Sequence, residues 1–167
     1  MAEEELQEQQ STEEEKIQEE IDTLGSTSAH VLHTHDKIDS RYSGDLDELK
    51  EGFAKVSLRT SDEMIVDKKG LVHGGFIFCA ADFAAMAAVN DPYVVLSGAT
   101  SKFLSPVRVG DTVVFTAKVR HTEGRRREVS VVGNVFDVKV FEAVLKTVIL
   151  ENHALDLNLM NISKSDK

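Results

Sequence analysis

The sequence predicts an α+β domain in which a curved antiparallel sheet of five or six strands wraps around one long central helix. Residues 75–89 are apolar almost throughout and rich in alanine, which favours a helix over a strand. The segments on either side alternate apolar and polar residues with the period of two that half-buried strands have. A helix that is apolar on every face must be covered on every face, so the sheet curls around it or a second subunit completes the cover.

The composition indicates one domain of ordinary size. The chain has 167 residues, of which 41% are hydrophobic, and this suits one core rather than two. The net charge of −10 is concentrated in residues 1–25, which hold ten acidic residues and one lysine. The remainder has 19 acidic and 18 basic residues, so charge does not identify its ligand. We expect residues 1–25 to be an acidic tail, helical or disordered, that suits contact with a protein partner.

The elements before the central helix are less regular. We expect a linker over residues 26–44 and the compact domain over residues 45–151. The domain is predicted to begin with a short helix at 45–50, a half-buried strand at 53–60, and a link over 61–72 with a turn at 67–70.

The linker contains three closely spaced histidines, His30, His33 and His35. Their spacing is compatible with metal ligands, but no cysteine accompanies them and the neighbouring aspartates are ordinary loop residues. We therefore favour a surface or interface role for these histidines over a metal site.

The segments after the central helix predict only strands. The helix itself is expected at about 74–89, where Asn90 and Pro92 end it. The later strands are expected at 93–104, 112–120, 127–136 and 140–150, followed by a C-terminal tail over 152–167.

Several classes of protein are disfavoured by what the sequence lacks. Cys79 is the only cysteine, so there is no internal disulfide, and we interpret it as a small buried hydrophobic residue. There is no apolar run of 18 residues and no signal-peptide pattern, so we expect no membrane span and a cytoplasmic location. No glycine-rich phosphate loop is present. The segment before the domain is acidic and short, so we expect no nucleic-acid binding.

Asp82 is the only polar side chain between Gly75 and Val89. A buried carboxylate is costly unless it is paired or hydrogen-bonded, so this position is a candidate for function. The alternative is a structural role, in which Asp82 makes hydrogen bonds that hold two subunits together.

The entrance of the predicted helix carries the sequence His73-Gly74-Gly75. Two glycines allow a ligand to approach the backbone closely, and the first N–H groups of a helix can polarise a carbonyl oxygen. Taken alone the motif usually means a tight turn. Gly75 and Asp82 share one helix face about 10.5 Å apart, so one carbonyl carbon does not easily contact both. Two antiparallel helices across a two-fold axis would bring Gly75 of one subunit near Asp82 of the other.

Two stretches together resemble a known family. His73-Gly74-Gly75 followed by Asp82 in an alanine-rich helix resembles the hot-dog-fold acyl-CoA thioesterases of the phenylacetyl-CoA type. The stretch KFLSPVRVGD, residues 102–111, resembles the second hallmark of that family. The resemblance covers about residues 45–151. The chain is similar, more loosely, to the acyl-CoA-sensing effector domain of the bacterial lipid-synthesis repressor that senses malonyl-CoA.

The resemblance implies a hot-dog fold and a homodimer, or a dimer of dimers, with two sites at the subunit interface. Its ligand would be a coenzyme A thioester, with no metal and no other cofactor. Asp82 would be the nucleophile or general base, the Gly75 amide would hold the carbonyl oxygen, and His73 is a further candidate catalytic residue. Asp67 stands where active members often carry Asn or Gln, and an anion there would repel the developing oxyanion.

Because of Asp67, we expect an acyl-CoA sensor or regulator with weak or no hydrolysis. The alternative is an active thioesterase that uses Asp82 and the Gly75 amide. A dimeric structural module without a ligand is disfavoured by Asp82. Contacts to the ligand are expected from residues at the helix entrance, on the strand at 93–104 and in an arginine run, namely Gly74, Gly75, Lys102, Phe103, Arg125, Arg126 and Arg127. The arginines would bind the phosphates of coenzyme A, although such a run is equally typical of a solvated loop.

Overall fold

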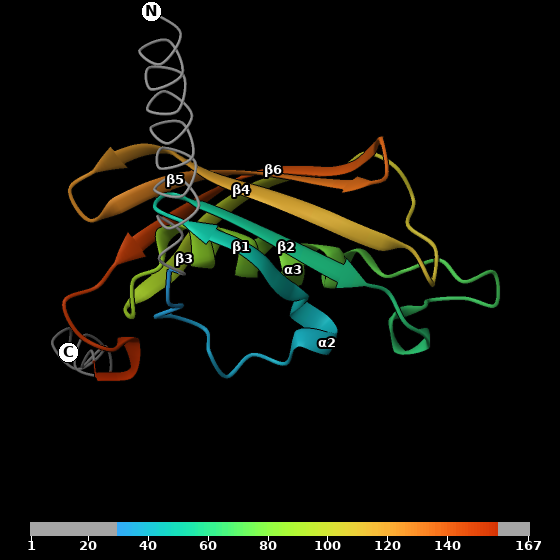
Figure 1. Ribbon diagram of the computed structural model, residues 1–167, viewed down its shortest axis with the longest axis horizontal. Helices are drawn as coiled ribbons and strands as arrows, with labels where there is room; N and C mark the ends of the chain where they lie inside the picture. The colour runs from blue at the N-terminus through green and yellow to red at the C-terminus, as the bar shows by residue number, and fades with distance from the viewer. Residues whose placement is uncertain (1–29, 157–167) are drawn as a thin grey trace, which may run out of the picture. The chain divides into compact units, whose positions relative to one another are not determined.

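The computed structural model describes residues 30–156, so the acidic tail expected over 1–25 lies outside the described residues. The described chain forms a six-stranded antiparallel sheet with one long helix against it, which confirms the predicted fold (Figure 1). The elements are α2 (Ser40–Ser43), β1 (Asp45–Lys50), β2 (Phe53–Arg59), α3 (Gly74–Val89), β3 (Val94–Phe103), β4 (Thr112–Glu123), β5 (Arg126–Val135) and β6 (Val138–Ile149), with single 3₁₀ turns at Asp62–Met64 and Ala154–Asp156.

The strand order in the sheet is β1-β2-β4-β5-β6-β3, so β1 and β3 are the edge strands. β3 follows the helix in sequence and pairs antiparallel with β6 at the far edge. In that pairing Phe103 lies opposite Phe141, whereas Val94 lies opposite Ile149. The end of β3 is therefore near the β5–β6 turn, and its start is near the β4–β5 hairpin.

The alternation of apolar residues predicted four of the strands well. On β4 and β5 the residues that face the helix are fully buried, and their sequence neighbours are more exposed. The prediction of a short helix at 45–50 is wrong, because this segment is β1 and pairs with β2. Leu46 and Leu49 are three residues apart, a helical spacing, but an irregularity in the strand pairing between Leu46 and Glu48 lets both leucines pack against the core.

Helix α3 occupies the range that its alanine content predicted. Asn90 ends it in the left-handed conformation, with φ of 53°, and its N–H bonds the Met86 carbonyl oxygen. The Asn90 side chain also accepts a hydrogen bond from the His33 amide at 2.7 Å and donates one to the Val31 carbonyl oxygen at 2.9 Å. The end of the helix is thus tied to the linker that precedes the sheet.

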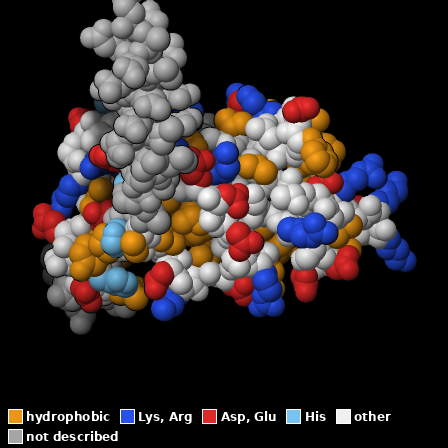
Figure 2. All heavy atoms as spheres, viewed as in Figure 1, with side chains coloured by type: hydrophobic (Ala, Val, Ile, Leu, Met, Phe, Trp, Pro, Cys, Tyr) orange, Lys and Arg blue, Asp and Glu red, His pale blue; other side chains and the backbone are white. Residues whose placement is uncertain are grey.

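One face of the domain can be seen to be mixed in charge (Figure 2). On the face that carries β1, β2 and α2, Figure 2 shows acidic and basic side chains interspersed, with basic side chains gathered toward the right-hand end. This face does not present the continuous basic surface on which nucleic-acid binding depends. Within residues 30–156, no helix is both long enough and apolar enough to cross a membrane.

Candidate functional site

One stripe of α3 is not covered by the sheet of its own chain. Gly75, Phe78, Cys79 and Asp82 follow the spacing i, i+3, i+4, i+7 and therefore lie on one helix face. Gly75 is exposed and the other three are half-buried, whereas the residues on the opposite faces, including Ile77, are buried. Of the two expected ways to cover the helix, the sheet of one chain does not suffice by itself, because this stripe lacks cover.

Asp82 is the one charged residue on this stripe. Its Oδ1 atom is buried and has no hydrogen-bond partner among the described residues. Burial raises the pKa of the Asp82 carboxyl to about 6, because the surrounding apolar groups disfavour the charged form. Burial, together with the charge of Asp82, also raises the pKa of the Cys79 thiol one turn earlier. At neutral pH the Asp82 carboxylate on this stripe is therefore mostly ionised, and its ionisation lowers the unfolding free energy.

His73 and Gly75 are in direct contact at the start of the helix. His73 is the N-cap of α3, and its Nδ1 atom accepts a hydrogen bond from the Gly75 amide at 2.8 Å. The contact is close enough that a Cβ atom on residue 75 would lie 2.7 Å from that nitrogen. The Gly75 amide is therefore occupied by His73, and it can bind another acceptor only if the imidazole turns away.

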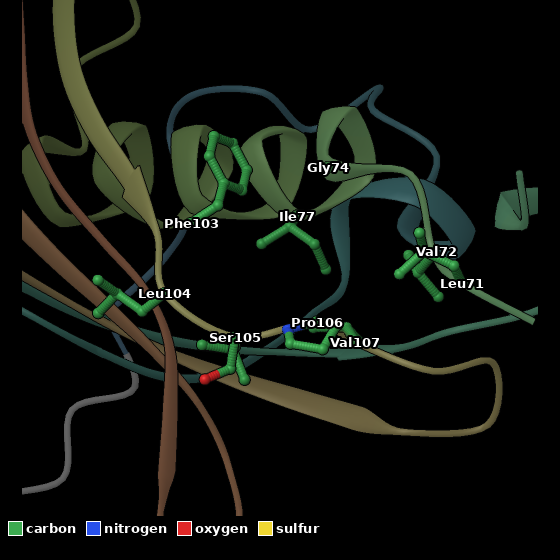
Figure 3. Close-up of a pocket in the computed structure, with 10 residues that line it drawn as sticks. Leu71, Val72, Gly74, Ile77, Phe103, Leu104, Ser105, Pro106 and Val107 are labelled. Carbon is green, nitrogen blue, oxygen red and sulfur yellow. The ribbon is translucent and has the colours of Figure 1, made fainter.

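A pocket of about 310 Å³ opens beside the first turns of α3. Figure 3 shows Ile77 pointing from the helix toward the segment after β3, with the Phe103 ring alongside the helix. The walls come from α3, the end of β3, the start of β6 and the segment before the helix, and consist of Leu71, Val72, Gly74, Ile77, Phe103, Leu104, Ser105, Pro106, Val107 and Val140. The side chains that line the pocket are thus mostly apolar, and one of its walls is Gly74, the neighbour of Gly75.

The absence of a side chain at Gly74 allows the Phe103 ring to pack directly against the start of the helix. A Cβ atom on residue 74 would lie 3.1 Å from Phe103 Cε1, which is tighter than ordinary van der Waals contact. The Phe103 ring also packs edge-on against Phe141, with ring centroids 5.2 Å apart. The structure therefore brings Gly74 and Phe103 together, as two sides of one pocket. Ile77 and Val140 also line it, and the sequence analysis placed them only within the central helix and the strand at 140–150.

Asp67 does not line this pocket and begins a tight turn before it. Its Oδ1 accepts hydrogen bonds from the Lys69 amide at 2.9 Å and the Leu71 amide at 3.2 Å, and the Gly70 amide bonds its carbonyl oxygen. Ile65 and Val72 pair at the base of the same loop. Within one protomer the carboxylate of Asp67 is therefore engaged in a turn rather than directed at the Gly75 amide.

The basic residues expected to bind phosphates are spread over the sheet. Lys102 pairs with Glu142 on β6 at 3.1 Å, and Arg125 pairs with Glu151 at 2.8 Å. Arg127 donates hydrogen bonds to the carbonyl oxygens of Gly124 and Arg126, at 2.7 and 2.9 Å. These contacts are exposed, so they cost little to exchange for a phosphate.

Arg126 and Arg127 line a second cavity, of about 440 Å³, near the β4–β5 hairpin, with Lys146 and His121 among its other walls. Arg126 lies opposite Val148 on β6, whereas Phe103 lies opposite Phe141. Seven residues of strand separate these two levels, about 23 Å. Within one protomer the arginines and the pocket beside Gly74 are therefore at opposite ends of the sheet.

Two histidines of the linker make separate contacts, His33 through its amide to Asn90 and His35 to its neighbour Thr34. His35 has a positive φ of 53°, and its Nδ1 atom lies 2.6 Å from the Thr34 hydroxyl. No group of three or more metal-binding side chains occurs in the described part of the chain.

Sequence comparison places the HGG motif and the helix in one family. The family model of the thioesterase superfamily matches residues 69–133. The acyl-coenzyme A thioesterase PaaI of Escherichia coli is 32% identical over 125 residues, which cover 74% of this chain and 84% of that enzyme. The chain belongs to the thioesterase superfamily. The hot-dog resemblance drawn from His73-Gly74-Gly75 and Asp82 is thereby confirmed.

Two other relatives are longer proteins, and this chain matches only part of each. A methylthioribose-1-phosphate isomerase of Aquifex aeolicus is 48% identical over 119 residues, 71% of this chain, yet the match spans only 26% of that protein. The transcription factor FapR of Caldanaerobacter subterraneus is 29% identical over 113 residues, 67% of this chain and 56% of the factor. The chain thus corresponds to one part of each protein.

The same superfamily fold is found in a solved structure that spans most of this chain. An uncharacterized protein from Pyrococcus horikoshii shares 44% sequence identity, with a TM-score of 0.75. The match covers 76% of this chain and 98% of that one. The two therefore share the whole sheet-and-helix domain.

Proposed function

We propose that this superfamily member binds acyl-CoA thioesters at the uncovered stripe of α3 and acts as a sensor or regulator with weak or no hydrolysis. The observation that carries the proposal is Asp82, whose buried carboxylate has an oxygen without a hydrogen-bond partner in the described chain. A buried unpaired carboxylate is a standing cost in stability, and a role toward a ligand accounts for it. The name of PaaI, an acyl-coenzyme A thioesterase, supports the same class of ligand.

Weak hydrolysis follows from the state of the Gly75 amide. In the ligand-free protein this N–H is held by His73 Nδ1 at 2.8 Å. A preformed oxyanion site has donors that are already free and directed at the developing charge. Here the donor must first release His73 Nδ1, and this cost reduces the stabilisation that the amide gives to the transition state.

The alternative function is an active acyl-CoA thioesterase, and one observation favours it. A general base works best when its pKa is near the working pH, and burial brings the pKa of Asp82 to about 6. At neutral pH this carboxylate would be mostly ionised and more basic than an exposed one. In this reading Asp82 directs water at the thioester carbonyl and the Gly75 amide holds the oxygen.

We propose that the working unit is a homodimer. The uncovered stripe of α3 carries Phe78 and Cys79 beside Asp82, so it is an apolar surface that a second helix would cover. β3 is an edge strand, and its exposed backbone is available for pairing with a second copy. Antiparallel pairing of two β3 strands would bring the partner's arginine hairpin to the end of the sheet where this chain's pocket opens. A dimer therefore offers a source of positive charge that one protomer lacks there.

The test is to measure binding and hydrolysis of the same acyl-CoA on wild type and on Asp82→Asn. The proposal predicts micromolar binding by the wild type with slow or undetectable turnover, and retained binding with no turnover in the variant. Brisk turnover by the wild type that Asp82→Asn abolishes would establish the alternative function. If wild type binds neither acyl-CoA nor free coenzyme A, both functions are excluded.

A further inference from the structure

We infer that Phe76, which is held by Tyr42 of α2, is a positioning residue that keeps the His73 imidazole on the Gly75 amide. The inference rests on the proposed function, in which this amide binds the carbonyl oxygen of the thioester. It identifies the side chains that control how often the amide is available to that ligand.

The His73 ring lies directly over Gly75. Its Nδ1 atom accepts the Gly75 N–H at 2.8 Å, and a Cβ atom on residue 75 would lie 2.7 Å from Nδ1 and 2.9 Å from Cε1. Nδ1 accepts this bond with its lone pair, so the ring N–H is on Nε2. The amide is therefore available to a ligand only in those molecules in which the ring has turned away.

Phe76 packs against the imidazole in this orientation. The centroids of the His73 and Phe76 rings are 6.2 Å apart, and the ring planes meet edge to face at 81°. A favourable aromatic pair of this kind shifts an equilibrium by about two- to ten-fold. A rotation that breaks the bond from Gly75 to Nδ1 also changes the arrangement of the two rings. The contact with Phe76 therefore favours the orientation in which the amide is occupied.

Tyr42 fixes the other side of the Phe76 ring. The two rings are stacked, with centroids 5.7 Å apart and an angle of 29° between their planes. Both side chains are half-buried and pack against the edge of the core. The family model matches residues 69–133, which include Phe76 but not Tyr42. The state of the Gly75 amide therefore depends on a residue outside the segment that the family model matches.

Helix α2 is anchored well enough to hold Tyr42 in place. The Asp39 carboxylate accepts hydrogen bonds from the Arg41 amide at 3.0 Å and from the Arg41 guanidinium at 2.6 Å. The guanidinium also lies 5.5 Å from the centre of the Tyr42 ring. Gly44 ends α2 with φ of 84° so close to β2 that a Cβ atom there would lie 2.7 Å from Val56 Cγ1. The position of Tyr42 over α3 is thus set by contacts on both sides of it.

The first measurement is hydrogen exchange at the Gly75 amide in the full chain. Gly74-Gly75 is the one pair of consecutive glycines in the sequence, so ¹³C in glycine carbonyls and ¹⁵N in glycine amides give a coupled signal from Gly75 alone. A hydrogen bond of ordinary strength protects an amide about two- to ten-fold. Exchange should therefore be about two- to ten-fold faster in Phe76→Leu and in Tyr42→Leu than in the wild type. Tyr42→Phe keeps the stacked ring and should exchange as the wild type does.

The second measurement is the affinity for hexanoyl-CoA and for free coenzyme A, by calorimetry on the same proteins. The apparent affinity rises in proportion to the fraction of protein whose site is available. Hexanoyl-CoA should therefore bind Phe76→Leu and Tyr42→Leu about two- to ten-fold more tightly than it binds the wild type. Free coenzyme A has no thioester carbonyl, so its affinity should be the same in all of these proteins.

Two controls distinguish release of the amide from damage to the fold. Phe53→Leu removes a ring of the same size from β2, where Phe53 lies beside Lys50 and Lys118, and it should leave both measurements unchanged. The Phe76 amide bonds the His73 carbonyl oxygen at 3.1 Å and so reports the first turn of α3. In Tyr42→Leu its exchange should stay as in the wild type. This variant carries the test if melting shows that Phe76→Leu is not folded.

The possible results separate this inference from the proposed function. If the wild type binds hexanoyl-CoA and the folded variants leave Gly75 exchange unchanged, the thioester site stands and the role of Phe76 is wrong. Faster exchange without tighter binding of hexanoyl-CoA overturns the inference, and so does an equal increase at the Phe76 amide in Tyr42→Leu. If the wild type binds no acyl-CoA, the proposed function fails and the inference fails with it.

Discussion

Replacement of Asp82 by Asn should change how stability depends on pH. Burial raises the pKa of Asp82 from its ordinary value of 3.8 to about 6, so the folded protein holds this proton more tightly than the unfolded chain. Between about pH 4 and pH 6 the unfolded chain has lost the proton while the folded protein keeps it. Stability is therefore greatest below this range and falls as the pH rises through it.

The magnitude follows from the size of the shift. A displacement of about two units, at about 1.4 kcal/mol per unit, corresponds to about 3 kcal/mol of unfolding free energy. Other carboxylates contribute their own pH dependence, but they are present in both proteins and cancel in the comparison. Between pH 4 and pH 7.5, the wild type should therefore lose about 3 kcal/mol more than Asp82→Asn does.

The assay is urea unfolding of both proteins at several pH values and one protein concentration, because a dimer's stability depends on concentration. Asp137→Asn, in the exposed β5–β6 turn, is the control and should follow the wild type. Equal pH dependence in wild type and Asp82→Asn would refute the reasoning. A wild type that gains stability relative to the variant as pH rises would refute it too, because it would mean that the ionised carboxylate has a partner.

Three other predictions concern Gly75, Asp67 and the N-terminal residues 1–25. Gly75→Ala should destabilise the protein by about 1 kcal/mol in urea unfolding and weaken acyl-CoA binding, because its Cβ would lie 2.7 Å from His73 Nδ1 and break the helix cap; unchanged stability would contradict this. Asp67→Asn keeps an oxygen for the turn in which the Asp67 carboxylate is engaged, so thioesterase assays should detect no change in hydrolysis. A gain in hydrolysis that still requires Asp82 would show that Asp67 reaches the thioester site in the assembled protein. Deletion of residues 1–25 should leave the melting temperature almost unchanged, and a drop of many degrees would show that the tail supports the domain.

The helix and most strands were predictable because their signals are local. Alanine content and the flanking Gly74 and Asn90 fix the range of α3, and period-two alternation fixes β2 and β4 to β6. The segment at 45–50 was misassigned, because its two leucines have a helical spacing that an irregularity in the strand pairing reconciles with a strand. A shift in pairing register depends on the partner strand, so it cannot be predicted from the sequence of one segment.

Some residues of the candidate site could be singled out from the sequence for the same reason. Asp82 and the glycines at the helix entrance stand out in the sequence because they differ from their neighbours. The contact between Gly74 and Phe103 depends on the register of β3 against β6, which no local pattern gives. The position of Asp67 depends on hydrogen bonds of its carboxylate to the turn that it begins, so its distance from Gly75 could not be read from a spacing of eight residues.

The most direct test of the proposed site is a crystal structure with a non-hydrolysable octanoyl-CoA analogue, in which a methylene group separates the sulfur from the carbonyl carbon. The account predicts that the carbonyl oxygen accepts a hydrogen bond from the Gly75 amide, with the His73 ring turned away from it. It also predicts that the Asp82 carboxylate of the partner subunit lies near the carbonyl carbon. An analogue bound elsewhere on the domain, with the His73–Gly75 hydrogen bond intact, would contradict it.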